Sequence, residues 1–179
     1  LKKLDPIPHP LNPDSLWIGS LGRLTQEKNY ETLITAATLI PQASFFVIGD
    51  GKEKLNLKSQ ISNLKMDDRF FIIPPTGEDA KYLKAFDIFA MTSIKEGFPY
   101  ALLEAMAAEL PAVITNTGGM PEAVPQKHNI VPQQNPERLM RALVRLIDNE
   151  EERIQEGREN RNEVESRFSL LAMKQATEN

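Results

Sequence analysis

The residues with the clearest capacity for chemistry lie in the stretch KEGFPYALLEAMAA, where two carboxylates, Glu96 and Glu104, are eight positions apart. Glu96 belongs to a turn, and Glu104 belongs to the apolar helix that follows it. Helical side chains lean toward the amino-terminal end of their helix, so we expect the Glu104 carboxylate to reach toward the turn. Carboxylate oxygens accept hydrogen bonds from the hydroxyl groups of a sugar or a ribose. The spacing therefore predicts two acceptors beside one small volume, with a solvated surface position as the alternative for each acid.

The stretch from Gly19 to Lys28, GSLGRLTQEK, places glycine and positive charge beside the start of a helix. Gly22 lets the backbone approach a ligand closely, and Arg23 and Lys28 add two cations where a helix N-terminus already favours anions. Asn29 is the expected N-cap of that helix. The stretch predicts a cradle for a diphosphate, although it matches neither a Walker loop nor a dinucleotide-binding fingerprint. A tight turn with two solvated cations is the alternative.

Two further turns contain glycine directly after apolar strands. The first is GDG, from Gly49 to Gly51, and the second is NTGGMPE, which includes Gly118 and Gly119. Such glycines either bring backbone N–H groups close to an anion or form simple turns. Pro99 suits the first position of the helix after the acidic turn, because its φ is already helical and its missing N–H has no helical partner there. These turns are therefore candidate parts of the same site.

Short apolar runs alternate with amphipathic segments along the chain. Strands are expected at residues 16–20, 44–49, 69–73, 87–93, 112–115 and 129–131, and helices at 29–40, 52–65, 77–85, 99–109, 120–124 and after Pro136. This alternation predicts βαβ units and a parallel sheet that is covered on both faces. Such a sheet binds ligands outside the carboxyl ends of its strands, which is where the candidate turns lie.

The two ends of the chain differ in character. Residues 1–14 contain several prolines and are expected to be an extended lead-in or linker, so the domain proper is predicted at 15–179. In the closing helices, apolar residues recur at helical spacing, which predicts a stripe that faces the core while the arginines point outward. The members of this stripe are Leu139, Leu143, Leu146 and Ile147.

The bulk composition fits one globular domain and excludes several classes of protein. The chain has 179 residues, of which 41% are hydrophobic and 26% are charged, and its net charge of −4 argues against a nucleic-acid partner. No apolar run approaches the roughly 20 residues that span a bilayer. The absence of cysteine excludes disulfides and thiol chemistry and fits a cytoplasmic location. No histidine and carboxylate cluster has metal-ligand spacing, so no metal is predicted, and His9 and His128 are expected at the surface.

Taken in order, three segments resemble the C-terminal, nucleotide-sugar-binding domain of the family 4 retaining glycosyltransferases: GRLTQEKNYETLI (22–34), GDG (49–51) and DIFAMTSIKEGFPYALLEAMAAELPAVITNTGGMPEAV (87–124). The resemblance extends from about residue 16 to the closing helices. Its most specific element is the Glu96-x7-Glu104 pair, followed by Gly-Gly-x-Pro-Glu. It implies an α/β fold, Rossmann-like with three α/β/α layers and a parallel sheet of about six strands, as one half of a GT-B enzyme.

The resemblance also implies the roles of the charged residues. Arg23 and Lys28 would bind the donor diphosphate and stabilise the nucleoside diphosphate as it leaves. Glu96 would contact the donor sugar, and Glu104 would hold the ribose hydroxyls. The resemblance thus assigns catalytic roles to Arg23, Lys28 and Glu96.

Further donor contacts are implied for backbone and apolar positions. Backbone at Gly97 and Phe98 would contact the sugar, and the base would lie against the loop near Ile73. Pro99 stands where many members of the family have glycine, and it removes one N–H from the donor site. The resemblance completes the donor-binding set with Gly22, Gly49, Pro99, Gly118 and Gly119.

The implied reaction is transfer of a sugar from a UDP-, GDP- or ADP-linked donor to an acceptor with retention at the anomeric carbon, without a metal or other cofactor. The family's N-terminal acceptor domain is absent from this chain, so we expect donor binding with little or no transfer by the chain alone. Membrane contact would arise only through that domain or through a lipid-linked acceptor, which gives a cytoplasmic location or one at the cytoplasmic face of a membrane. The alternatives are a non-catalytic nucleotide-sugar-binding or interaction module and a GT-B-like sugar-nucleotide epimerase. A glycosidase would instead need two carboxyl groups about 5 to 10 Å apart across a glycosidic bond.

Overall fold

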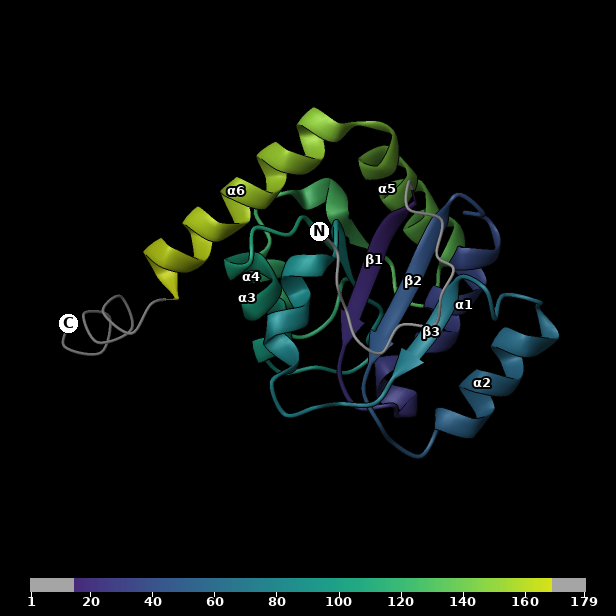
Figure 1. Ribbon diagram of the computed structural model, residues 1–179. Helices are drawn as coiled ribbons and strands as arrows, with labels where there is room; N and C mark the ends of the chain where they lie inside the picture. The colour runs from purple at the N-terminus through teal and green to yellow at the C-terminus, as the bar shows by residue number, and fades with distance from the viewer. Residues whose placement is uncertain (1–14, 169–179) are drawn as a thin grey trace.

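Six parallel strands form the centre of residues 15–168, the part of the chain that the computed structural model describes (Figure 1). They are β1 (Leu16–Leu21), β2 (Ala43–Ile48), β3 (Phe70–Ile73), β4 (Ile88–Met91), β5 (Ala112–Thr115) and β6 (Ile130–Val131). Their order in the sheet is β3-β2-β1-β4-β5-β6, which is a Rossmann order with its switch point between β1 and β4. The predicted parallel sheet is confirmed, while the predicted lead-in at 1–14 lies outside the described residues.

The strands read as continuous apolar runs because both faces of the sheet are buried. All six residues of β2 are buried, and their side chains alternate between two hydrophobic clusters. Phe45 and Val47 belong to one cluster, and Phe46 and Ile48 belong to the other. The sheet is therefore the middle layer of three, as expected.

One face of the sheet is covered by α1 (Tyr30–Thr38), α2 (Lys54–Asn63) and α5 (Pro136–Asp148). Leu33, Leu57 and Leu143 contribute one buried side chain each from these helices to the first hydrophobic cluster. At the start of α5, the Asn135 side chain accepts a hydrogen bond of 3.0 Å from the Arg138 N–H, and Pro136 occupies the first turn. This is a good helix start, because the side chain satisfies an N–H that has no helical partner and proline has none to satisfy.

The other face is covered by η2 (Asp79–Ala85), α3 (Tyr100–Ala107) and α4 (Met120–Ala123). Leu83, Leu102 and Met106 are fully buried there against the second hydrophobic cluster. The helix predicted at 77–85 is confirmed, and it is a 3-10 helix. A 3-10 helix rises about 2.0 Å per residue against 1.5 Å for an α-helix, so a short connection covers more of the sheet.

The last helix, α6 (Glu150–Arg167), follows α5 and reaches α3 on the opposite face (Figure 1). It packs against the segment that leads into β5, at the amino ends of the strands. Gly157 lies so close to the Glu109 carbonyl oxygen that a Cβ at Gly157 would approach this oxygen to 2.0 Å. The Asn160 side chain donates a hydrogen bond of 2.8 Å to the Leu110 carbonyl oxygen. This helix is therefore fixed largely by small and polar residues.

Candidate functional site

The four predicted loops meet at the carboxyl ends of the strands and are joined by backbone hydrogen bonds. The loop after β1 contacts the loop after β2 through the Leu24 N–H, which donates to the Asp50 carbonyl oxygen at 2.9 Å. It also contacts the turn after β4, because the Ile94 N–H donates to the Glu27 carbonyl oxygen at 2.8 Å. The Gly119 N–H, in the loop after β5, donates to the Gly97 carbonyl oxygen at 2.8 Å. The predicted grouping of these loops is confirmed.

The centre of this group is an ion pair between the Lys28 ammonium and the Glu96 carboxylate. The same carboxylate oxygen, Oε1, accepts a hydrogen bond of 2.8 Å from the Ser93 hydroxyl. Lys28 and Glu96 are 16% and 12% exposed, so solvent screens the pair only in part. Sequence analysis assigned these two residues to different parts of a donor and missed their contact, which joins positions 68 residues apart.

The backbone on the Lys28 side of the pair is fixed by Thr92, the residue that directly follows β4. The Thr92 hydroxyl lies 3.1 Å from the Lys28 carbonyl oxygen and 3.0 Å from the Asn29 carbonyl oxygen, and it donates to both. Asn29 precedes α1 as predicted, in the left-handed region with φ of 49°, but its side chain does not cap the helix backbone. Its Nδ2 instead donates to the Thr32 hydroxyl at 2.7 Å, so Asn29 is the N-cap as expected but without a side-chain capping bond.

The paired glycines of the fourth loop pack directly on the acidic turn. Gly118 has a φ of +53°, and a Cβ there would come within 2.1 Å of the Glu96 carbonyl oxygen. A Cβ at Gly119 would lie 2.7 Å from the Phe98 ring. These glycines are therefore required by contact between the loops, whatever ligand they meet.

Gly49 has the same packing role between the first two loops, whereas Gly97 does not. A Cβ at Gly49 would lie 2.0 Å from the Gly22 carbonyl oxygen, while a Cβ at Gly97 would meet no atom within 4 Å. The backbone of Gly97 is thus open on its outer side. Because glycine has no side chain, a ligand can approach the backbone here more closely than it could with any other residue at this position.

Arg23, in the loop after β1, and Glu104, on α3, are the two remaining charged residues predicted for the site. Both side chains are exposed, and neither forms a hydrogen bond or ion pair within the described part of the chain. Glu104 lies on α3, whose first residue is Tyr100, and the preceding Pro99 is extended, with φ of −76° and ψ of 124°. Pro99 is therefore the N-cap of α3, and its predicted place at the first helical position is wrong by one residue. Both side chains remain available to a ligand.

Tyr30 and Ser20 lie beneath the loop after β1, and sequence analysis missed both. Burial raises the pKa of the Tyr30 hydroxyl far above its usual range; a hydrogen bond with Ser20 opposes the shift, and the Glu96 carboxylate adds to it. Tyr30 thus stays neutral at physiological pH. The Tyr30 hydroxyl would lie 3.1 Å from a Cβ at Gly22, which has a φ of +156°, so this glycine leaves room for the phenol.

Ile73 ends β3 at the same edge of the sheet, beside the second loop. Its carbonyl oxygen accepts a hydrogen bond of 2.9 Å from the Gly49 N–H, and its side chain is 6% exposed. A groove of about 340 Å³ begins at Ile73 and Pro74 and follows the outer side of β3 past Phe71. A groove is therefore present at the position predicted for the nucleotide base. The Ile73 side chain itself packs in the second hydrophobic cluster.

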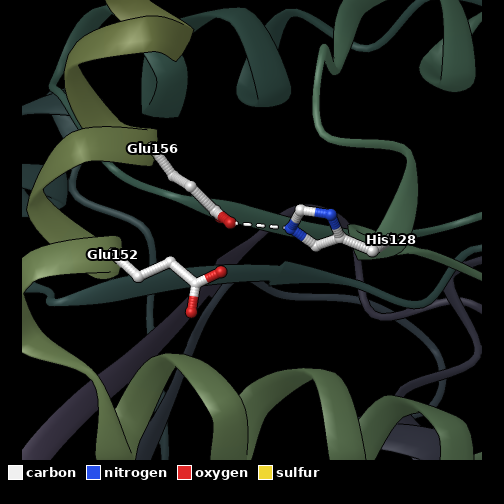
Figure 2. Close-up of side chains that lie close together, drawn as sticks. All are labelled: His128, Glu152 and Glu156. Carbon is white, nitrogen blue, oxygen red and sulfur yellow. Dashed lines mark hydrogen bonds and ion pairs between the residues drawn. The ribbon is translucent and has the colours of Figure 1, made fainter.

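A second polar cluster lies at the amino ends of the strands, where α6 meets η3 (Lys127–Asn129) and α5 (Figure 2). His128, Glu152 and Glu156 each place one possible metal ligand within 4.8 Å of the others. Both carboxylates, however, already contact the Arg145 guanidinium, at 3.0 Å in the case of Glu156. The cation that these acids face is thus an arginine, and the cluster is a structural junction.

This junction corrects one expectation from the sequence and agrees with another. Arg145 was expected to point outward with the other arginines, but it points inward and bridges the two carboxylates. His128 is 55% exposed, in line with the predicted surface position, yet it pairs with the buried Glu156 at 2.8 Å. The residues come from three separate segments, so no local spacing signals the cluster.

The sheet order and the polar loops at its carboxyl ends define a Rossmann-like α/β domain. Residues 2–163 match the glycosyl transferases group 1 family, and the chain therefore belongs to this family.

Curated relatives of the chain act in the assembly of polysaccharides and glycoconjugates. The chain is 30% identical to the amylovoran biosynthesis glycosyltransferase AmsK of Erwinia amylovora. The alignment is 195 positions long and covers 99% of this chain and 46% of AmsK. It is 27% identical over 170 residues to the UDP-Gal:alpha-D-GlcNAc-diphosphoundecaprenol alpha-1,3-galactosyltransferase of Escherichia coli, with coverage of 90% and 44%. The chain spans less than half the length of both relatives.

Solved structures show the same fold. Anabaena Alr3699/HepE in complex with UDP superposes with a TM-score of 0.85 and 22% identity, over 92% of this chain and 48% of that chain. The C-terminal domain of the glycosyl transferase group 1 family protein LpcC from Francisella tularensis superposes with a TM-score of 0.78 and 24% identity, over 87% of each chain. The fold is thus the Rossmann-like domain of GT-B glycosyltransferases. Within residues 15–168, no helix has the length and apolar character needed to cross a bilayer.

Proposed function

We propose that this chain is the donor-binding, C-terminal half of a family 4 retaining glycosyltransferase, and that the donor lies across the loops at the carboxyl ends of the strands. The observation that carries the proposal is the convergence of Lys28 and Glu96 from two loops onto one partly buried pair. A cation for a diphosphate and an acceptor for a sugar hydroxyl thus lie side by side. The exposed Arg23 and Glu104 extend this arrangement.

Each charged residue has a role in this proposal that follows from its chemistry. Departure of a nucleoside diphosphate develops negative charge on phosphate oxygens, so Arg23 and Lys28 would stabilise the transition state more than the ground state. Glu96 would accept from a sugar hydroxyl and Glu104 from the ribose hydroxyls. Because these two cations supply the positive charge, the proposal includes no metal and no other cofactor.

Backbone and apolar groups complete the proposed donor site. The open side of Gly97 leaves space for the sugar, and the groove at Ile73 leaves space for the base. Among nucleotides, UDP is the first to test, because UDP stands in the name of the galactosyltransferase relative and was bound in the HepE structure. The remaining proposed contacts are Gly22, Gly49, Phe98, Pro99, Gly118 and Gly119.

The proposed partner of this half is an N-terminal acceptor domain. The named relatives are more than twice as long as the part that this chain matches, and a C-terminal domain of the family superposes on it. We propose that transfer with retention needs both halves and that this chain alone binds donor without robust turnover. The absence of cysteine supports a cytoplasmic site of action, with membrane contact only through the other domain or a lipid-linked acceptor.

Isothermal calorimetry of the chain with UDP, GDP and ADP tests the proposed function. Binding of one nucleoside diphosphate, and tighter or altered binding of its sugar conjugate, is the expected result. An interaction module that keeps only the fold would bind none of the three. Conversion of the bound sugar nucleotide to its epimer, followed by NMR, would instead indicate an epimerase, and robust glycosyl transfer by the chain alone would contradict the need for a second domain.

A further inference from the structure

Ser93 is the buried residue that contacts the candidate site most directly and has no role in the proposed function. It follows β4, and its side chain is fully buried. Its hydroxyl donates a hydrogen bond of 2.8 Å to Glu96 Oε1. A buried hydroxyl that donates to a carboxylate forms a stronger hydrogen bond than one between neutral groups, and it fixes the direction of the acid.

The position of Ser93 is itself fixed by the neighbouring strand. The Thr115 hydroxyl, at the end of β5, donates to the Ser93 carbonyl oxygen at 2.5 Å. Two residues on, the Thr117 hydroxyl donates to the Ile94 carbonyl oxygen at 3.1 Å. The turn that carries Ser93 is therefore held by β5 before it reaches Glu96, so the serine is a rigid support.

The two partners of Glu96 both contact the same oxygen. Lys28 and Ser93 bind Oε1, whereas Oε2 accepts no hydrogen bond from any residue in 15–168. A carboxylate whose one oxygen is fixed by two donors presents the other oxygen in a fixed direction. An unused acceptor of this kind is suited to a ligand hydroxyl.

We infer that Ser93 is a positioning residue for the donor sugar, which orients Glu96 so that Oε2 accepts a hydrogen bond from a sugar hydroxyl. This inference rests on the proposed function, since it assigns a specificity device to the same site. Ser93 itself does not touch the donor. Its loss should therefore affect recognition of the sugar and leave recognition of the nucleoside diphosphate unchanged.

The test is calorimetry of wild type and Ser93→Ala with three pairs of probes: UDP and UDP-galactose, GDP and GDP-mannose, and ADP and ADP-glucose. For the pair that wild type binds, Ser93→Ala should weaken the sugar nucleotide about tenfold, the size expected for a hydrogen bond to a charged group, with little change for the nucleoside diphosphate. Equal weakening of both probes, or no weakening of either, would overturn the inference. The matched control is Ser44→Ala, which removes another buried hydroxyl, bonded to Ser15 at 3.0 Å near the amino end of β2, and should change neither affinity.

A double-mutant cycle separates positioning from a general structural effect. If Ser93 acts through Glu96, then Ser93→Ala should cause no further loss of sugar-nucleotide affinity in a Glu96→Ala background. A persisting tenfold loss in that background would show that the serine supports the turn in another way.

Crystal structures of wild type and Ser93→Ala provide a second test of the positioning role, and this test needs no ligand. The expected result is a rotated or disordered Glu96 carboxylate in the variant, with the backbone of the turn unchanged. If wild type binds none of the six probes, the proposed function fails, and the positioning role is then decided by these structures. A Glu96 carboxylate that keeps its place in the variant would contradict the inference.

Discussion

Glu96 and Glu156 are both largely buried acids that pair with a cation, but they lie at opposite ends of the sheet and differ in how their oxygens are used. Glu156 is 5% exposed, and both oxygens are occupied: Oε1 by Arg145 and His128, and Oε2 by Asn129. Glu96 is 12% exposed, and both of its donors share Oε1. Burial and an ion pair therefore do not by themselves distinguish a structural acid from a candidate ligand-binding acid.

The number of unused acceptors makes the distinction. Both oxygens of Glu156 already accept hydrogen bonds from protein groups, and its removal leaves buried donors without partners. Glu96 keeps one oxygen for a new donor and lies beside the open backbone of Gly97. Substitutions at the two acids should thus have opposite consequences, one mainly on folding and the other mainly on binding.

The largest effect is expected for Glu156→Ala. The substitution leaves the Asn129 amide without its carboxylate acceptor and leaves Arg145 with Glu152 alone, and breaking such a buried network costs about 3 to 5 kcal/mol of unfolding free energy. Urea denaturation followed by circular dichroism measures this loss, and Glu151→Ala, an exposed acid on the same helix, is the matched control. At temperatures where the variant is folded, nucleotide affinity should equal that of wild type. A stability change below the control would show that the junction is not structural.

A smaller effect, now on binding, is expected for Lys28→Ala and Arg23→Ala. Each substitution removes a charged hydrogen bond to the proposed diphosphate and should weaken nucleoside diphosphate binding by about 1.5 to 3 kcal/mol. Calorimetry measures the change. Lys81→Ala removes an exposed cation from η2 and is the control for net charge. Affinity that stays at the wild-type value would remove the substituted residue from the site.

Gly118 and Gly97 extend the comparison, because the first is required by packing and the second leaves room for a ligand. Gly118→Ala forces a side chain into a left-handed backbone and against Glu96, so a loss of about 1 to 3 kcal/mol in unfolding free energy is expected. Gly97→Ala meets no protein atom and should change stability by less than about 0.5 kcal/mol. Because its methyl group would occupy the proposed sugar space, Gly97→Ala should still weaken sugar-nucleotide binding. Urea denaturation and calorimetry of both variants test this, and unchanged sugar-nucleotide binding by Gly97→Ala would place the sugar elsewhere.

At the junction, a smaller effect than that of Glu156→Ala is expected for His128→Ala. His128 is more than half exposed, and Glu156 keeps Arg145 and Asn129 when the imidazole is removed. The expected loss of unfolding free energy is therefore about 0.5 to 1.5 kcal/mol, the net value of one hydrogen bond. Urea denaturation at fixed pH measures it. A loss as large as that of Glu156→Ala would mean that the histidine, not the arginine, holds the junction together.

The fold was predictable because its signals are local. The strands are buried on both faces, so each reads as a short apolar run, and the helices between them show helical periodicity. The type of η2 was not predictable, since Leu83 and Phe86 bury equally well from a 3-10 helix or an α-helix. The sequence likewise does not fix the first residue of α3 to within one position, so Pro99 was predicted inside the helix and is found at its N-cap.

The candidate site was predictable only as a set of loops. Glycines and charged residues at strand ends indicated which turns to consider, but the contact of Lys28 with Glu96 depends on β1 and β4 being neighbours in the sheet. The order of strands is a property of the whole sheet, and no spacing along the chain encodes it. The Arg145 junction was missed for the same reason, because its members come from α5, α6 and η3.

The docking of α6 also bears on how the chain folds. Its buried residues, Glu156, Gly157 and Asn160, contact groups such as the Glu109 and Leu110 carbonyl oxygens, which are in place only after α3 and β5 have come together. Contacts between distant segments form late, since the entropy of closing a long loop opposes them. A helix that docks late protects the finished domain by slowing its unfolding and has little influence on the rate of assembly. If α6 docks after the transition state for folding, substitutions on its small and polar face should speed unfolding and leave the folding rate nearly unchanged.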